Sequence, residues 1–351
     1  MAPAASAAAF EAAFQAIPQG VVLLDEDRCI RWCNSMAAVH LSLDPSGDIG
    51  QPITNLVRDP ALLAALSDDD APKDFRIGSH KPEHTLLLQV RTFEEDQQLI
   101  LTQDVTDADR MELMRRDFVA HVSHEIRTPL TVLAGFVETM QMLALEERER
   151  DRVLDLMRQQ TVRMENLVAD LLLLATLEGS PKPPISQWKP LEHLIRTAVA
   201  DGQHLSAGHH TIAFDPVPPI ELAVEEDEIA SAIGNLVSNA VRYTPASGSI
   251  HLQTMWRSDG YLEIRVKDTG IGIERQHIPR LTQRFYRVDK SRSRGTGGTG
   301  LGLAIVKHAI GRHGGELLIQ STPGEGSVFT LTLPPARVRA IAPNVTGSSP
   351  T

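Results

Sequence analysis

The sequence is poor in cysteine, in basic charge and in long apolar runs, and each shortage excludes a class of protein. Its 351 residues include only Cys29 and Cys33, too few for a disulfide framework, which indicates a reducing compartment. Acidic residues outnumber basic ones by 45 to 34, giving a formal net charge of −11, so the chain is not expected to bind nucleic acid directly. No run reaches the ~18 apolar residues of a membrane span. The first residues lack the basic segment with which a signal peptide begins, so no signal peptide is predicted. We therefore expect a soluble, cytoplasmic protein.

The chain is long enough for two or three domains, and its first part predicts a small α+β domain at residues 8–106. Short apolar runs that are interrupted by acidic turns are typical of antiparallel hairpins. Two hairpins are predicted, one from residues 20–24 and 29–32, the other from residues 85–90 and 98–101 around a turn at 94–96.

Residues 107–178 have a helical period instead. Apolar residues recur three or four positions apart, first from Met111 to Val137 and then from Val153 to Leu174. The charged stretch Glu146–Arg150 predicts a turn or a solvated joint between the two helices. Two such helices cannot bury both apolar stripes alone, whereas two copies of the pair can do so in a four-helix bundle. We therefore expect a homodimer.

Beyond residue 178 the composition changes again. Glycine and proline predict a linker at residues 179–186, followed by a domain at 187–336 and a disordered tail at 337–351. Helices are predicted near residues 191–200 and 227–241, and strands at 250–255, 262–267, 317–321 and 328–333. Helices beside a mostly antiparallel sheet form an α/β sandwich, so the whole chain is expected to be a multidomain α+β protein.

His124 is the candidate nucleophile on the first long helix. It lies two residues from apolar neighbours on either side, so at ~100° per residue its side chain should point away from the core. A neutral imidazole is a good nucleophile near pH 7, and Glu125 is placed to accept the other ring N–H. Thr128 shares the exposed face one turn later, just before Pro129, which should bend the helix. A solvent-facing histidine alone is more often a surface residue, and His121 keeps that interpretation.

Later segments carry residue types that suit a nucleotide. Asn235 and Asn239 stand one helical turn apart, where amide oxygens suit Mg²⁺, and Arg242 follows to meet a phosphate. Asp268 follows a predicted strand and can accept a hydrogen bond from an adenine amino group. The glycines after Asp268 would let the backbone approach the ligand. Residues 284–287 could pack as a lid with cations facing phosphate.

The glycine-rich run at residues 295–302 is the richest phosphate-binding signal, because it opens a helix whose N–H groups could meet an anion. Gly295, Gly297 and Gly300 also spell the dinucleotide-binding pattern GxGxxG. However, no strand precedes this run and no Walker lysine follows it. We therefore reject a dinucleotide fold.

The segments together resemble a known family. Residues 123–130, which read SHEIRTPL, resemble the H-box of the dimerisation and phosphoacceptor domain of sensor histidine kinases. The later segments resemble, in order and spacing, the N, G1, F and G2 boxes of the ATP-binding domain shared by histidine kinases, the Hsp90 chaperone, DNA gyrase and MutL. Residues 281–289 and 297–308 look most like phosphate-regulon sensor kinases of the PhoR type. The first hundred residues resemble a PAS domain.

The resemblance implies a protein-histidine kinase that uses ATP and Mg²⁺ in phosphate-starvation signalling. His124 would be the phosphoacceptor, Glu125 its activating carboxylate, and Thr128 the residue that aids dephosphorylation of a partner response regulator. Asn239 would be the direct metal ligand. The implied nucleotide-binding residues are Asn235, Asn239, Arg242, Tyr243, Asp268, Gly270, Gly272, Arg287, Gly298, Thr299, Gly300, Leu301 and Gly302.

Two other functions are compatible with parts of this pattern. An ATP-driven conformational clamp or chaperone could use the same ATP fold with His124 as a surface residue, but it would release free phosphate and form no acid-labile protein phosphate. A sensing scaffold with an inactive kinase is the third reading. The family usually begins with membrane-spanning helices, but no apolar run in this sequence is long enough to span a membrane. We therefore expect any association with the inner face of the membrane to be made through a partner protein.

Overall fold

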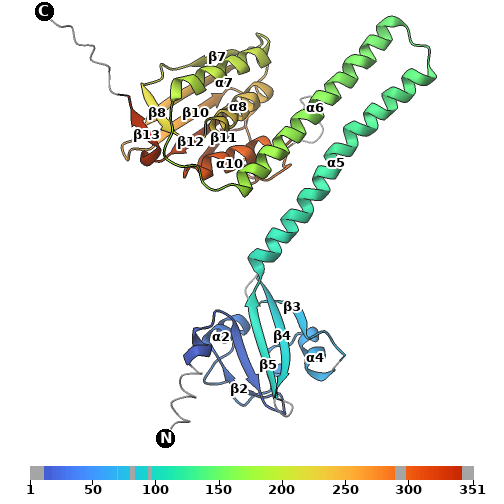
Figure 1. Cartoon of the computed structure of the whole chain (residues 1–351), viewed down its shortest axis with the longest axis vertical. Helices are drawn as coiled ribbons and strands as arrows, with labels where there is room; N and C mark the ends of the chain where they lie inside the picture. Colours follow the sequence, from blue (N-terminus) through green and yellow to red (C-terminus); the bar gives the residue numbers. More distant parts are fainter. Residues whose placement is uncertain (1–11, 69, 80–83, 94–96, 289–297, 342–351) are drawn as a thin grey trace, which may run out of the picture. The chain divides into compact units, whose positions relative to one another are not determined.

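The computed structural model describes residues 12–68, 70–79, 84–93, 97–288 and 298–341, and Figure 1 shows its elements. It forms two compact units, residues 1–120 and 121–351, and the division falls inside helix α5 (Thr106–Met142). None of the helices in the described ranges is long and apolar enough to cross a membrane.

The first unit is built on a five-stranded antiparallel sheet in the order β2-β1-β5-β4-β3. Both predicted hairpins are present, since β1 pairs with β2 and β4 pairs with β5. The predicted turn at residues 94–96 lies outside the described residues. The strands are β1 (Gly20–Leu24), β2 (Ile30–Cys33), β3 (Asp74–Gly78), β4 (Thr85–Phe93) and β5 (Gln97–Asp104).

Three helices share one apolar core with this sheet. They are α2 (Ser35–Leu41), α3 (Ile53–Leu56) and α4 (Pro60–Ser67). Alternate residues of β4, namely Leu86, Leu88 and Val90, are buried among them, as the two-residue period of a strand requires. Helix α5 begins two residues after β5 ends.

The second unit contains the rest of α5, helix α6 (Glu147–Gly179) and an α/β domain with two sheets. The larger sheet has the order β11-β12-β10-β9-β7, in which only the β7–β9 pair is parallel among the described strands. The smaller sheet has the order β13-β8-β6. The strands are β6 (Trp188–Pro190), β7 (Thr211–Phe214), β8 (Ile220–Ala223), β9 (Ser249–Trp256), β10 (Leu262–Asp268), β11 (Leu317–Thr322), β12 (Gly326–Leu333) and β13 (Val338–Ala340).

Helices α7 (Leu191–Ser206), α8 (Glu226–Tyr243) and α10 (Gly302–Arg312) pack beside these strands. Their apolar positions are almost wholly buried, for example Ile195 on α7, Leu236 on α8 and Ile305 on α10. This arrangement of helices on a mostly antiparallel sheet confirms the predicted α/β sandwich. Figure 1 shows the three helices stacked over the larger sheet.

Two sequence predictions are wrong in detail. The charged stretch at Glu146–Arg150 is not a joint, because α6 begins at Glu147 with Glu146 as its N-cap and a capping box to Glu149. Acidic side chains favour a helix N-terminus, which explains the helical start. The tail is not irregular from residue 337, since β13 pairs with β8 and Arg337 is buried. Residues 342–351 lie outside the described ranges.

His313 follows α10 and is a buried polar residue of the α/β core. It is 1% exposed; its Nδ1 donates to the carbonyl of Ala309 at 2.7 Å, and its Nε2 accepts the backbone N–H of Glu225 at 3.0 Å. Burial is the main cause that lowers the pKa of His313 to about 4; the hydrogen bond to the Ala309 carbonyl opposes the shift, and the nearby Arg337 and Arg312 charges add to it. The imidazole is therefore neutral at physiological pH.

We predict that this neutral histidine makes the second unit sensitive to acid. An unfolded histidine binds its proton near pH 6.5 and the folded one near pH 4, so the unfolded state binds more protons between these values. The free energy of unfolding therefore decreases as the pH is lowered from 6.5 to 4. At 1.36 kcal/mol per pKa unit, the loss should reach about 3 kcal/mol at pH 4. Urea unfolding of wild type and His313→Gln at matched pH should show the stability difference between them shrinking as the pH falls from 6.5. A difference that stays constant would contradict the assignment.

Candidate functional site

Helix α8 places two asparagine side chains one turn apart near the start of α10. Asn235 donates from Nδ2 to the carbonyl of Ser231 at 3.0 Å, and a Cβ atom on Gly302 would lie 2.5 Å from Asn235 Oδ1. A side chain at the first residue of α10 would therefore have to displace the Asn235 amide. The amide of Asn239 is half-buried and has no hydrogen-bond partner within the described part of the chain.

Asp268 and two glycines form one end of the site, where strand β10 stops. Asp268 is 5% exposed, and its Oδ1 accepts the backbone N–H groups of Gly270 at 2.8 Å and Ser327 at 3.2 Å. Burial raises the pKa of this carboxyl, and the two N–H donors oppose the rise. Oδ2 has no partner among the described residues. Gly270 lies against the carbonyl of Tyr243, where a Cβ would come within 2.6 Å, and Gly272 has a φ of 66°.

Arg242 and Arg287 form the other end. A Cβ atom on Gly298 would lie 2.8 Å from Arg242 Nη1 and 4.0 Å from Arg287 Nη2. The backbone of the glycine-rich segment thus comes directly against two guanidinium groups. Burial lowers the pKa of both arginines. Two partly desolvated guanidinium groups beside an open backbone can bind phosphate.

The segment that contains Phe285 is tied to the glycine-rich segment and reaches α5. The Phe285 N–H donates to the carbonyl of Gly300 at 2.9 Å, and a Cβ on Gly300 would lie 2.9 Å from Phe285 Cα. Phe285 has a φ of 61°, in the left-handed region. Its ring stacks on the imidazole of His121, with 5.7 Å between centroids. No local sequence pattern predicts this contact, because a histidine on the exposed side of a helix is ordinarily a surface residue.

The phosphoacceptor segment lies on α5. His124 is exposed, as its spacing predicts, and its imidazole has no hydrogen-bond partner among the described residues. Glu125 Oε2 lies 3.9 Å from Nη2 of Arg163 on α6. The Thr128 hydroxyl donates to the carbonyl of His124 at 3.1 Å, and Pro129 lies inside the helix.

One face of α6 packs against α10 and the glycine-rich segment. We call it the docking face. Leu167, Leu174 and Leu177 are at most 4% exposed there, and Asp170 accepts the Thr299 hydroxyl at 2.7 Å. Burial raises the pKa of Asp170, partly offset by this hydrogen bond. The residues of the docking face recur three or four apart and are Arg163, Leu167, Asp170, Leu174 and Leu177.

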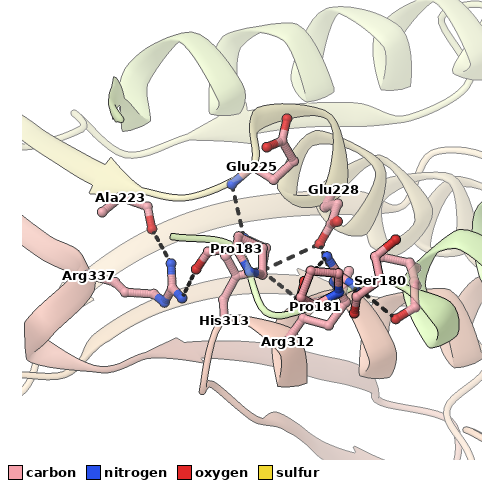
Figure 2. Close-up of polar contacts among 11 residues, drawn as sticks. Ser180, Pro181, Pro183, Ala223, Glu225, Glu228, Arg312, His313 and Arg337 are labelled. Atoms are coloured by element: carbon pink, nitrogen blue, oxygen red, sulfur yellow. Dashed lines mark hydrogen bonds and ion pairs between the residues drawn. The ribbon is translucent and has the colours of Figure 1, made fainter. Parts of the chain in front are cut away.

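Figure 2 shows how the end of α6 is held to the α/β domain. Arg312 donates from Nε to the carboxylate of Glu228 at 3.1 Å. Its two terminal nitrogens donate to the carbonyls of Leu177 at 3.1 Å, Ser180 at 2.8 Å and Pro181 at 2.9 Å. Arg337 binds the carbonyls of Pro183 and Ala223 at 2.6 and 2.7 Å. The residues after α6 are therefore fixed along the domain surface.

Comparison with known proteins agrees with this geometry. Residues 8–98 match the PAS fold, residues 114–180 match the His Kinase A (phospho-acceptor) domain, and residues 224–337 match the histidine kinase-, DNA gyrase B- and HSP90-like ATPase. The chain is 44% identical over 326 residues to the phosphate regulon sensor protein PhoR of Pseudomonas aeruginosa, covering 92% of this chain and 73% of that one. It is 29% identical to PhoR of Haemophilus influenzae, covering 91% and 74%. The histidine kinase ThkA, solved in complex with the response regulator TrrA, aligns with 90% of this chain and 95% of its own at 19% identity and a TM-score of 0.49.

The chain belongs to the sensor histidine kinases, with a PAS domain, a phosphoacceptor domain and an ATP-binding domain. It is a protein-histidine kinase that binds ATP, and its relatives point to the phosphate regulon. The sequence-based prediction of this class is confirmed. The clamp or chaperone alternative finds no support among the relatives.

We predict that Arg312→Ala destabilises the second unit by about 3 kcal/mol, as expected when one partner of a buried ion pair is removed. Glu228 is 7% exposed, so its carboxylate would lose its partner with little access to water, whereas Ser180 and Pro181 are exposed and their carbonyls can be hydrated. Urea unfolding measures the change.

Two further variants isolate the cause. Adding Glu228→Gln to Arg312→Ala should recover much of the lost stability, because the unpaired charge is then gone. Arg339→Ala, which breaks an exposed pair with Glu221, should cost under about 1 kcal/mol. A double variant that is less stable than Arg312→Ala alone would contradict the explanation.

Proposed function

We propose that His124 is the residue that this kinase phosphorylates. The carrying observation is that Glu125, beside the exposed His124, pairs with Arg163 on the same face of α6 that contacts the glycine-rich segment through Asp170. The acceptor segment and the ATP site thus share one helix face. One ring nitrogen of His124 would attack the γ-phosphorus while the bond to the ADP oxygen breaks, and Glu125 would accept the other ring N–H.

The nucleotide-binding residues divide into two groups in this proposal. Asp268 accepts from the adenine amino group through Oδ2, and Gly270 and Gly272 let the backbone approach the base beside Tyr243. Arg242 and Arg287 bind the phosphates, which lie against the backbone of the glycine-rich segment. The residues of that segment in this group are Gly298, Thr299, Gly300, Leu301 and Gly302.

Asn239 fits the metal ligand that the nucleotide requires. Its amide has no partner among the described residues, and Mg²⁺ is commonly held by one or two protein oxygens together with phosphates and water. Bound Mg²⁺ would neutralise phosphate charge. Asn235 supports the site by fixing the start of α10. Transfer then depends mainly on positioning and on charge neutralisation.

The kinase is proposed to work as a homodimer that passes its phosphoryl group to a response-regulator aspartate in phosphate-starvation signalling. Large apolar side chains outside the docking face are exposed, including Leu130 at 55% and Leu172 at 65%, which suits burial against a second copy. Phosphate signalling is supported by the likeness to the two phosphate regulon sensors. We infer a cytoplasmic location for the ATP site, where ATP is available, and leave any membrane contact to a partner.

The first test incubates the full chain with ATP that carries a labelled γ-phosphate. Wild type should form an acid-labile, base-stable protein phosphate, and His124→Gln should form none while keeping its affinity for ADP. His121→Gln is the matched control and should keep the label. Label retained by His124→Gln would refute the proposal.

Asn239→Ala should weaken Mg²⁺-dependent ATP binding measured by calorimetry, because the substitution removes the proposed metal ligand.

The second test concerns Thr128. Its hydroxyl lies one turn from His124 and currently bonds the His124 carbonyl, so it must rotate to orient a water. We expect Thr128→Ala to keep self-phosphorylation within a few-fold but to lose phosphatase activity on the order of 10²-fold. The assay adds the variant with ADP to a phosphorylated regulator and follows its decay. Decay at the wild-type rate would leave Thr128 as a residue that only bonds the helix backbone.

A further inference from the structure

Arg163 stands where the acceptor segment and the phosphate end of the ATP site meet. It lies on the docking face two helical turns before Asp170, which bonds Thr299 of the glycine-rich segment. The side chain of Arg163 is 26% exposed. Its only described ion pair is with Glu125, at 3.9 Å, near the limit for such a contact. A pair this long is weak and can be exchanged for a better partner.

Arg163 lies within electrostatic range of two other guanidinium groups. Arg242 and Arg287 flank the Gly298 backbone, and the charge of Arg163 acts on both, lowering each pKa in addition to the larger effect of burial. Asp170 and Glu125 are the carboxylates that oppose this positive charge. Asp170 is already hydrogen-bonded to Thr299. Like charges gathered in a partly desolvated place are unfavourable unless an anion joins them.

We propose that Arg163 is a catalytic residue that binds the γ-phosphoryl group during its transfer to His124. This inference rests on the proposed role of His124. As the γ-phosphorus leaves the ADP oxygen and bonds the imidazole nitrogen, Arg163 moves its N–H donors from Glu125 to the phosphoryl oxygens. No proton is exchanged by Arg163.

The same movement frees Glu125. A carboxylate that is paired with a guanidinium is a poorer hydrogen-bond acceptor for the imidazole N–H, because the positive charge draws on its electron density. When Arg163 turns to the phosphoryl group, Glu125 is released to His124 at the moment the imidazole becomes cationic. The phosphoacceptor helix pair would thus supply both a positive charge for the phosphoryl group and a carboxylate for the imidazole.

The test compares Arg163→Gln and Arg163→Lys with Arg158→Gln in the full chain. Arg158 is the matched control, since it lies on the same helix, is 75% exposed and, among the described residues, forms an ion pair with Asp155 of the same helix. Because Arg163 contacts the group in transit rather than the bound nucleotide, Arg163→Gln should lower kcat for self-phosphorylation by about 10²-fold, as removal of a transition-state donor does. The KM for ATP and the calorimetric Kd for ADP should stay within about twofold. Arg158→Gln should match wild type.

Arg163→Lys keeps the charge but loses the planar fork, so its kcat should fall between wild type and Arg163→Gln. Three results would overturn the inference: a kcat for Arg163→Gln within twofold of wild type, an equal loss of ADP affinity, or a lysine variant no faster than the glutamine variant. His124→Gln is run beside them. If His124→Gln still takes up label, the proposed acceptor is wrong; if it does not while Arg163→Gln behaves as wild type, only the role of Arg163 fails.

Discussion

The packing of α6 on the α/β domain is the contact on which the geometry of the second unit depends. Its stability comes mainly from Leu167, Leu174 and Leu177, since burying a leucine side chain is worth about 1.5–3 kcal/mol. The polar contacts add less free energy but fix direction and register. Asp170 meets the glycine-rich segment at one point of the helix, and Arg312 holds the helix end at another. Two fixed points on a rigid helix determine where Arg163 and the α5 segment beside it must lie.

An acidic protein can bind an anionic nucleotide, because the charges near the site affect binding more than the net charge of the chain does. The chain carries a formal charge of −11, yet Arg242 and Arg287 flank Gly298, where phosphate is proposed to bind, and the charge of Arg163 reaches both. Partial burial strengthens their local field, because water screens them less. The excess of acidic residues elsewhere favours solubility and discourages unspecific binding of polyanions.

Much of the fold could be predicted from sequence, and candidate nucleotide-binding residues could be proposed, because their signals are local. Asn235 and Asn239 lie one turn apart on one helix face, and Asp268 is the last residue of strand β10 with its glycines directly after it, so spacing alone identifies each group. Arg163 and Asp170 could not be found this way. Asp170 meets a hydroxyl 129 residues further along the chain, and a single charged residue in a long helix is ordinarily solvated.

The shortest strands were missed for a related reason. β6 and β13 each have three residues, and pairing with β8 rather than any local pattern makes them strands. Leu167 and Leu174 were predicted to belong to an apolar stripe buried in a four-helix bundle. In the structure they lie on the docking face, because α6 has apolar residues on more than one side. A hydrophobic period identifies buried positions without identifying the partner that buries them.

The left-handed backbone at Phe285 links two parts of the site mechanically. A residue with a side chain pays roughly 1–2 kcal/mol for this conformation, and here the bond from Phe285 N–H to the Gly300 carbonyl holds it in place. If the glycine-rich segment moves away, that bond is lost and Phe285 can relax toward ordinary backbone angles. Its ring would then leave His121, one turn from His124. Movement of Gly300 would thus be coupled to the contact between Phe285 and the helix that carries His124.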